Sequence, residues 1–108
     1  MQEEEHRIHL DTNLILDLDA QAVIREDSAV PLPAIEFRLL SYMAHHMGQV
    51  ISAETLISIA WPDGWPRGAQ DLYYHIHRAR KIIGDTQHPF RVVQSRRGSG
   101  YLLIRHQD

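Results

Sequence analysis

The stretch that decides the fold covers residues 69–84 and reads Ala69-Gln-Asp-Leu-Tyr-Tyr-His-Ile-His-Arg-Ala-Arg-Lys-Ile-Ile83-Gly84. Its apolar residues recur at helical spacing, which predicts a helix from about residue 69 to 83 that ends at Gly84. The side that must face a core consists of Leu72, Ile76, Ala79 and Ile83. A second side, polar and aromatic, consists of Asp71, Tyr74, His75 and Arg78. The helix therefore has one face for packing and another for solvent or a partner.

Two shorter helices are predicted before it. From Pro33 the apolar period is helical, with one face made of Phe37, Leu40, Ala44 and Met47 and widened by Leu39 and Met43. Pro33 suits a first helical position, and Gly48 suits the stop. Ser52 is expected to cap a second helix, which carries Glu54 in its first turn and ends at Pro62. The following turn-rich loop, 61–68, contains Trp61, expected in the core, and Trp65.

Short strands flank these helices. Residues 7–31 alternate apolar and polar side chains between turn residues, which predicts a small antiparallel sheet. After the long helix, residues 90–95 and 101–104 read as two strands around Arg96-Arg97-Gly98-Ser99-Gly100. The predicted fold class is α+β: an N-terminal antiparallel sheet, three helices and a C-terminal β-hairpin. A helix-turn-helix followed by a basic hairpin is the order of a winged helix-turn-helix.

Charge is distributed unevenly along the chain. Up to Pro66 there are three basic and eleven acidic residues, a net charge of −8, and from Arg67 onward eight basic and three acidic residues, a net charge of +5. A polyanion at close range meets this local charge and not the overall −3. Chance clustering of charges on a solvated surface is the alternative.

Both basic elements suit double-stranded DNA. Side chains like those of the polar helix face can meet base edges in a major groove, and Arg80 and Lys81 beside them could neutralise phosphates. Glycines at 98 and 100 allow a tight turn that carries Arg96 and Arg97 outward on a ribbon thin enough for a narrow groove. An amphipathic helix with a solvated face and a surface hairpin that is basic by chance remain the alternatives.

Several stretches together resemble one known family. They are Leu32-Pro-Ala-Ile-Glu-Phe-Arg-Leu-Leu40, Gly48-Gln-Val-Ile-Ser-Ala-Glu-Thr-Leu56, Trp61, His75-Ile-His-Arg-Ala-Arg-Lys81 and Val93-Gln-Ser-Arg-Arg-Gly-Ser-Gly-Tyr101. From about residue 7 to 104 the chain resembles the DNA-binding effector domain of OmpR/PhoB-type response regulators. The resemblance implies a four-stranded N-terminal sheet, a recognition helix at about 69–83 in the major groove and a wing at 96–100 in the minor groove.

The resemblance also implies individual roles. Tyr74, His75 and Arg78 match positions that read bases or clamp the DNA backbone, and Arg80 matches a position that holds phosphate. On the hairpin, Arg97 matches a position that enters the minor groove, and Ser95 and Tyr101 match positions that contact the DNA backbone near the wing. The predicted DNA-binding set is Gln70, Asp71, Tyr74, His75, Arg78, Arg80, Lys81, Ser95, Arg96, Arg97 and Tyr101. RNA polymerase is the implied partner of the loop 61–68, with Asp63, Trp65 and Arg67 as contacts.

Family members usually bind as two protomers on tandem half-sites. They are usually switched by phosphorylation of a separate receiver domain. The resemblance therefore implies that this chain is the output domain of a two-component response regulator. The sequence departs from the family pattern at Pro33, where a capping threonine is usual, and at Gln70, Asp71 and Tyr73. Asp71 on the reading face would be repelled by phosphate unless it accepts from a cytosine amino group. The alternative function is a protein-interaction module on the same fold that uses Trp65 and the sheet edge and has lost DNA binding.

Other functional classes are disfavoured. The chain has no cysteine and no apolar run near the ~20 residues that span a bilayer. Its eight histidines lack metal-site spacing, since His75 and His77 point to different sides of the helix and His45 and His46 are adjacent. No nucleophile–base pair or phosphate loop stands out, so we expect no enzyme and no cofactor or metal. Residues 1–6 read as an acidic tail or linker remnant without a leader sequence, 7–108 as the domain, and the cytoplasm as its location.

Overall fold

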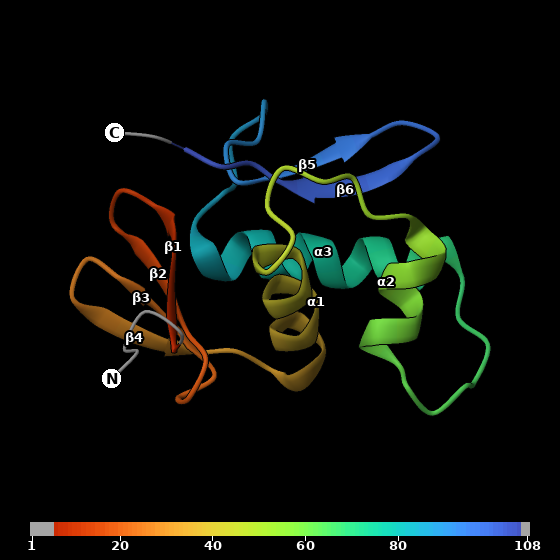
Figure 1. Cartoon of the computed structure of the whole chain (residues 1–108), viewed down its shortest axis with the longest axis horizontal. Helices are drawn as coiled ribbons and strands as arrows, with labels where there is room; N and C mark the ends of the chain where they lie inside the picture. Colours follow the sequence, from red (N-terminus) through yellow and green to blue (C-terminus); the bar gives the residue numbers. More distant parts are fainter. Residues whose placement is uncertain (1–5, 107–108) are drawn as a thin grey trace.

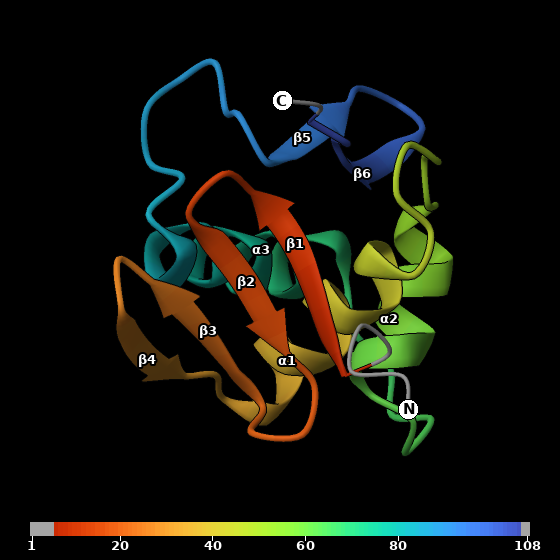
Figure 2. The same cartoon turned by 60° about the vertical axis from the view of Figure 1, so that its left-hand side comes forward.

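The computed structural model describes residues 6–106; the acidic start at 1–5 and residues 107–108 lie outside the described part. The fold is α+β, as predicted, and its elements are shown in Figure 1. In chain order they are β1 (Arg7–Asp11), β2 (Leu14–Asp17), β3 (Ala22–Arg25), β4 (Ser28–Pro31), α1 (Ala34–Ala44), α2 (Ala53–Ala60), α3 (Ala69–Ile83), β5 (Val93–Arg96) and β6 (Gly100–Leu103). The sheet of the first four strands packs at one end of the three helices, and the β5–β6 hairpin lies along α3 (Figures 1 and 2).

The N-terminal sheet is a four-stranded antiparallel meander in the order β1-β2-β3-β4. Its alternation places Leu14 and Leu16 of β2 on the buried face, where Leu16 opposes Val23 of β3. That face joins the core formed with the helices, because successive side chains of a strand point to opposite sides. The sheet covers the end of the helical unit and leaves α3 free along its outer side.

Helix α1 packs through a face shifted slightly from the predicted one. Pro33 precedes the helix, in the N-cap position, without a side-chain cap. The residues that α1 buries are Glu36, Leu39, Leu40, Met43 and Ala44, whereas Phe37 and Met47 are only partly buried. The predicted face is confirmed at Leu39, Leu40, Met43 and Ala44, with Phe37 and Met47 packed at its edge, and the buried stripe also includes the carboxylate of Glu36, which the sequence did not predict.

Helices α2 and α3 begin and end where the sequence predicts. Ser52 caps α2 by accepting a hydrogen bond from the backbone N–H of Thr55 at 3.1 Å. Helix α3 buries Leu72, Ile76, Ala79 and Ile83, as predicted, and ends at Gly84, whose φ of +80° satisfies the left-handed C-cap conformation. Trp61 lies in the core as expected, with 9% of its surface exposed.

The C-terminal hairpin is joined to the segment between α1 and α2. Ile51 and Tyr101 exchange two backbone hydrogen bonds, of 2.8 and 3.0 Å, and the N–H of Gly48 donates to Leu103 at 2.9 Å. The hairpin begins later than predicted, at Val93, because the buried Asp85 carboxylate accepts the N–H groups of residues 91–93 at 2.8–2.9 Å. These contacts fix the hairpin to the helical body at its root.

A candidate nucleic-acid interface

The outer side of α3 presents a mixed polar and aromatic surface. Its exposed polar and aromatic residues are Gln70, Asp71, Tyr73, Tyr74, His77 and Lys81. Tyr73 and Tyr74 each expose 55% of their surface. Gln70, Tyr74, His77 and Lys81 recur at helical spacing opposite the buried Leu72–Ile76–Ala79 side, so they form the centre of this face. Donors, acceptors and aromatic rings in such an array are the groups that can contact base edges and phosphates.

His75 was predicted at a position that reads bases or contacts the DNA backbone, but it does not lie on this outer face. Its Nδ1 donates to Oε2 of Glu36 on α1 at 2.5 Å, and its side chain is only 17% exposed. The ring also packs edge-on against Trp61, at a centroid separation of 5.4 Å. His75 is thus turned toward α1, because its helical position faces the flank of the core.

Arg78 stands at the rim between the outer face and that flank. Its side chain is 43% exposed, and its Nε lies 3.8 Å from Oε2 of Glu36. The guanidinium carbon is 5.7 Å from the centre of the Tyr74 ring. Arg78 is therefore accessible at the interface and is also attracted by the buried carboxylate of Glu36.

Arg80 corrects a second prediction, because it is buried and not a surface group beside the reading face. Only 3% of the residue is exposed. Its Nε donates to the carbonyl of Val93 at 3.0 Å, its Nη2 donates to Oγ of Ser95 at 3.3 Å, and its guanidinium carbon lies 3.8 Å from the Phe90 ring centre. Burial lowers the pKa of Arg80, against the opposing effect of Asp85. Arg80 joins α3 to β5.

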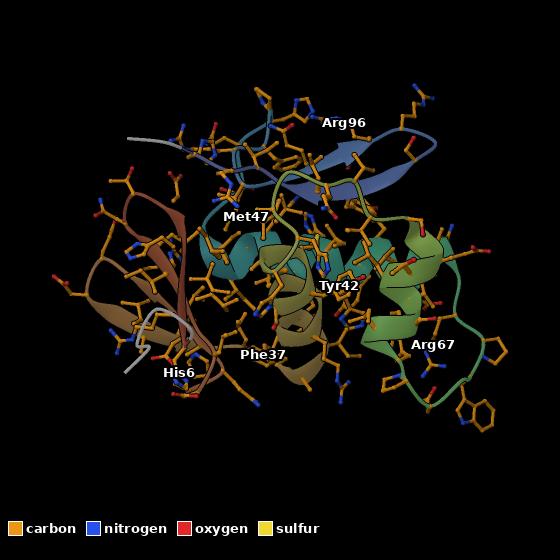
Figure 3. All side chains as sticks on the ribbon, viewed as in Figure 1. His6, Phe37, Tyr42, Met47, Arg67 and Arg96 are labelled. Atoms are coloured by element: carbon orange, nitrogen blue, oxygen red, sulfur yellow. The ribbon has the colours of Figure 1, made fainter. Side chains whose placement is uncertain are left out.

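The hairpin carries the remaining basic groups. Ser95, Arg96 and Arg97 are exposed, and Arg96 donates to Oε1 of Gln94 at 2.9 Å. Figure 3 shows Arg96 on the hairpin and Arg67 on the loop between α2 and α3. Tyr101 is half-buried, and burial raises the pKa of its hydroxyl.

Asp71 has a local structural role. Its Oδ2 accepts the backbone N–H of Gly68 at 2.9 Å at the start of α3, a position with no side chain of its own to cap the helix. An acidic group in the first turn also interacts favourably with the helix dipole. Asp71 is thus a capping residue at the edge of the interface.

The loop 61–68 is ordered by its own polar contacts. Oδ1 of Asp63 accepts the N–H of Trp65 at 2.8 Å, and Oδ2 of Asp63 lies 3.6 Å from Nη2 of Arg67. Trp65 remains 70% exposed. The loop therefore presents an indole ring on a braced backbone next to the start of α3.

Sequence reasoning missed Tyr73 and His77. Their rings stack at a centroid separation of 6.2 Å with planes inclined by 18°, on exposed positions of α3. The sequence contains a signal for them. Gln70, Tyr74, His77 and Lys81 recur at helical spacing, and Tyr73 lies one helical turn before His77. The predicted face, made of Asp71, Tyr74, His75 and Arg78, shares Tyr74 with the observed outer face but is rotated toward α1 at His75 and Arg78.

Two findings concern other classes of site. Among residues 6–106, no group of three or more His, Cys, Asp or Glu side chains is arranged to hold a metal ion. Over the same residues, no helix has the length and apolar character needed to cross a membrane.

Comparison with known proteins agrees with this geometry. The family described as "Transcriptional regulatory protein, C terminal" matches residues 27–103. The two-component response regulator PhoP of Pseudomonas aeruginosa is 33% identical over 90 residues, which cover 83% of this chain and 40% of PhoP. The chain thus spans less than half the length of that relative.

Two solved structures extend the likeness over nearly the whole fold. The DNA-binding domain of CpxR from E. coli is 26% identical, with a TM-score of 0.75 over 91% of this chain and 95% of that one. The DNA-binding domain of Klebsiella pneumoniae RstA, solved in complex with the RstA box, is 24% identical, with a TM-score of 0.79 over 93% of this chain and 98% of that one.

The fold and the paired basic elements define a winged helix-turn-helix domain of transcription regulation, a class that is not one of enzymes. The chain belongs to the family of C-terminal domains of transcriptional regulatory proteins, the DNA-binding effector domains of OmpR/PhoB type.

Proposed function

We propose that this domain binds double-stranded DNA with α3 in the major groove and the 96–100 wing in the adjacent minor groove. The observation that carries the proposal is the pair of hydrogen bonds from Arg80 to Val93 and Ser95, which fixes the basic wing beside the exposed face of α3. A reading helix and a cationic ribbon held side by side match two neighbouring grooves of a duplex. The structure of the RstA DNA-binding domain in complex with the RstA box, a domain of the same fold, supports DNA binding.

Affinity and specificity then come from different residues. Arg96, Arg97 and Lys81 neutralise phosphates or enter the minor groove, where negative potential attracts arginine. Gln70, Tyr74 and Arg78 meet base edges, and Ser95 and Tyr101 contact the backbone. Asp71 caps α3 and faces a base amino group at the edge of the interface.

In its full-length context we assign the domain, residues 7–108, to the output end of a two-component response regulator in the cytoplasm. The similarity to PhoP supports this assignment. A second protomer would occupy a tandem half-site. RNA polymerase would contact the loop with Asp63, Trp65 and Arg67, since an exposed tryptophan on a braced loop suits a protein partner.

The test is selection of duplexes from a randomised library, followed by titration of a labelled selected duplex and a scrambled one at two salt concentrations. We expect enrichment of one motif and binding that weakens as salt rises. Arg78→Ala should weaken binding to the selected duplex by about 1–3 kcal/mol and relax base preference, and Arg97→Ala should lower the salt slope by about one unit. Arg7→Ala, on the sheet away from α3, is the matched control.

Failure of any duplex to bind at low salt would refute the proposal. It would favour the protein-interaction module, for which the 70% exposure of Trp65 is the supporting observation. Equal losses on both duplexes for Arg78→Ala would remove base reading by that residue.

A further inference from the structure

The feature that DNA docking leaves unused is the carboxylate of Glu36. It lies on the core stripe of α1 and is only 1% exposed. Its Oε2 accepts from Nδ1 of His75 at 2.5 Å, whereas its Oε1 has no hydrogen-bond partner among the described residues. A buried carboxylate is costly unless cationic or hydrogen-bonding groups compensate it, so its neighbours on α3 are energetically tied to it.

Two groups of α3 share this one carboxylate oxygen. Arg78 approaches Oε2 to 3.8 Å from the outer rim, and His75 contacts it from within. Two neighbouring titratable or charged groups are Tyr74, whose ring meets His75 and Arg78, and Arg67, whose guanidinium lies over the Trp61 ring that packs against His75. No second acid among the described residues forms an ion pair with His75 or Arg78.

We infer that Glu36 is a positioning residue for DNA recognition, which holds Arg78 in its reading position, and that the proton on His75 controls this hold. The inference rests on the proposed function, since it assigns to Arg78 a base-reading role. Glu36 itself is too buried to touch DNA.

The physical basis is competition for one negative charge. A neutral His75 donates a hydrogen bond to Glu36 but adds no charge, so the carboxylate attracts Arg78 across 3.8 Å. A protonated His75 neutralises the carboxylate in a short ion pair, and the attraction on Arg78 falls. Imidazole is the side chain whose charge commonly changes between about pH 5 and 8, so pH is the variable with which this exchange is tested.

The consequence for binding is a change of specificity and not only of affinity. When Glu36 holds it, Arg78 is preorganised and meets the bases with little loss of side-chain freedom. When released, Arg78 becomes a mobile cation that any phosphate can attract, so binding to scrambled DNA strengthens and discrimination declines. A partly exposed ion pair is worth little, so discrimination should change about two- to fivefold.

The experiment compares the selected and scrambled duplexes at about pH 6 and about pH 8, at equal salt, for four proteins. The wild type should lose about two- to fivefold in discrimination on going to the lower pH. Glu36→Gln should show low discrimination at both values, because the amide accepts from His75 but cannot attract Arg78. His75→Gln should show high discrimination at both, because its amide donates but takes up no proton. His77→Gln, which alters a residue of the outer face of α3, should keep the wild-type pH dependence of discrimination whatever its effect on affinity.

A second measurement needs no DNA. The Nε–H resonance of Arg78 should shift with pH in the free wild-type domain and stay constant in His75→Gln. A double-mutant cycle completes the test, since Glu36→Gln should have no further effect on discrimination in an Arg78→Ala background. If Glu36→Gln fails to fold by circular dichroism, His75→Gln and the resonance decide alone.

The inference fails if wild-type discrimination is independent of pH, or if its pH dependence survives in His75→Gln. It also fails if His77→Gln abolishes the dependence, which would assign the effect to direct contact by His77. A wild-type domain that selects no motif would refute the proposed function instead, so the two failures are distinguishable.

Discussion

Gly100 is the position where one methyl group should disconnect the wing from the helical body. Its φ is +144°, a conformation that residues with a side chain rarely adopt, and a Cβ at this position would lie 1.9 Å from the carbonyl oxygen of Ile51. The nearest atoms belong to backbone, so no side-chain rotation can relieve the overlap. Gly100→Ala must therefore strain the hairpin or break the Ile51–Tyr101 pairing.

The cost follows from these two routes. Backbone strain of this kind costs about 1–3 kcal/mol, and the two hydrogen bonds of the Ile51–Tyr101 bridge contribute about 0.5–1.5 kcal/mol each. Together these contributions should lower the free energy of unfolding of Gly100→Ala by about 2–6 kcal/mol, a large part of the ~5–15 kcal/mol typical of small domains. DNA binding should fall with it, because the wing loses its fixed position.

Urea unfolding followed by circular dichroism measures the change in the free energy of unfolding. The matched control is Gly98→Ala in the same hairpin, where φ is +79° but no atom lies within 4 Å of an added Cβ. That variant should lose only about 1–2 kcal/mol, the cost of a left-handed conformation alone. Equal losses for the two variants would refute the close approach of Gly100 to Ile51 as the decisive contact.

Three further predictions concern charged groups. Asp71→Ala should lower the free energy of unfolding by about 1 kcal/mol through loss of the helix cap. Asp71→Asn keeps a cap acceptor but removes the negative charge, so it should raise affinity for scrambled DNA. Equal unfolding curves for the two variants would contradict a capping role. Arg80→Met should cost about 2–4 kcal/mol, since Val93 loses a buried donor, and a stable variant with normal wing contacts would show that Arg80 does not join the two elements. The hydrogen bond from Arg91 lowers the pKa of Asp11, so this carboxylate stabilises the fold above its unfolded pKa of about 3.9 and loses that effect as the pH falls through its depressed folded pKa. Asp11→Asn should therefore be about 0.5–1 kcal/mol less stable than the wild type at neutral pH, the gap closing on acidification; a gap unchanged by acid would exclude the Asp11–Arg91 pair as its source.

Local sequence signals predicted the elements better than their contacts. Ser52 and Gly84 mark helix ends through interactions with their own neighbours, and those bounds are confirmed. The core side of α3 is also confirmed, because four apolar residues at helical spacing allow only one orientation. On α1, both Phe37 and Leu39 are apolar, and only packing against α3 decides which one faces inward.

The candidate site was harder to predict because its polar residues act across elements. Glu36 and His75 are 39 positions apart, and Arg80 and Val93 are 13 apart. A pattern read along α3 alone assigns the polar residues His75 and Arg80 to solvent. Their actual partners are a carboxylate on a core stripe and a carbonyl in a strand, neither of which has a periodic signature.

The strand-like pairing of Ile51 with Tyr101 has a consequence for the thermodynamics of recognition. The base of the wing is hydrogen-bonded to the connection between α1 and α2, so the wing is held at its root before a duplex arrives. The distance between reading helix and ribbon is thus set during folding, and association need not supply the entropy of ordering it. Because the distance between α3 and the hairpin is fixed in the free domain, the domain should select duplexes whose groove spacing already matches that distance.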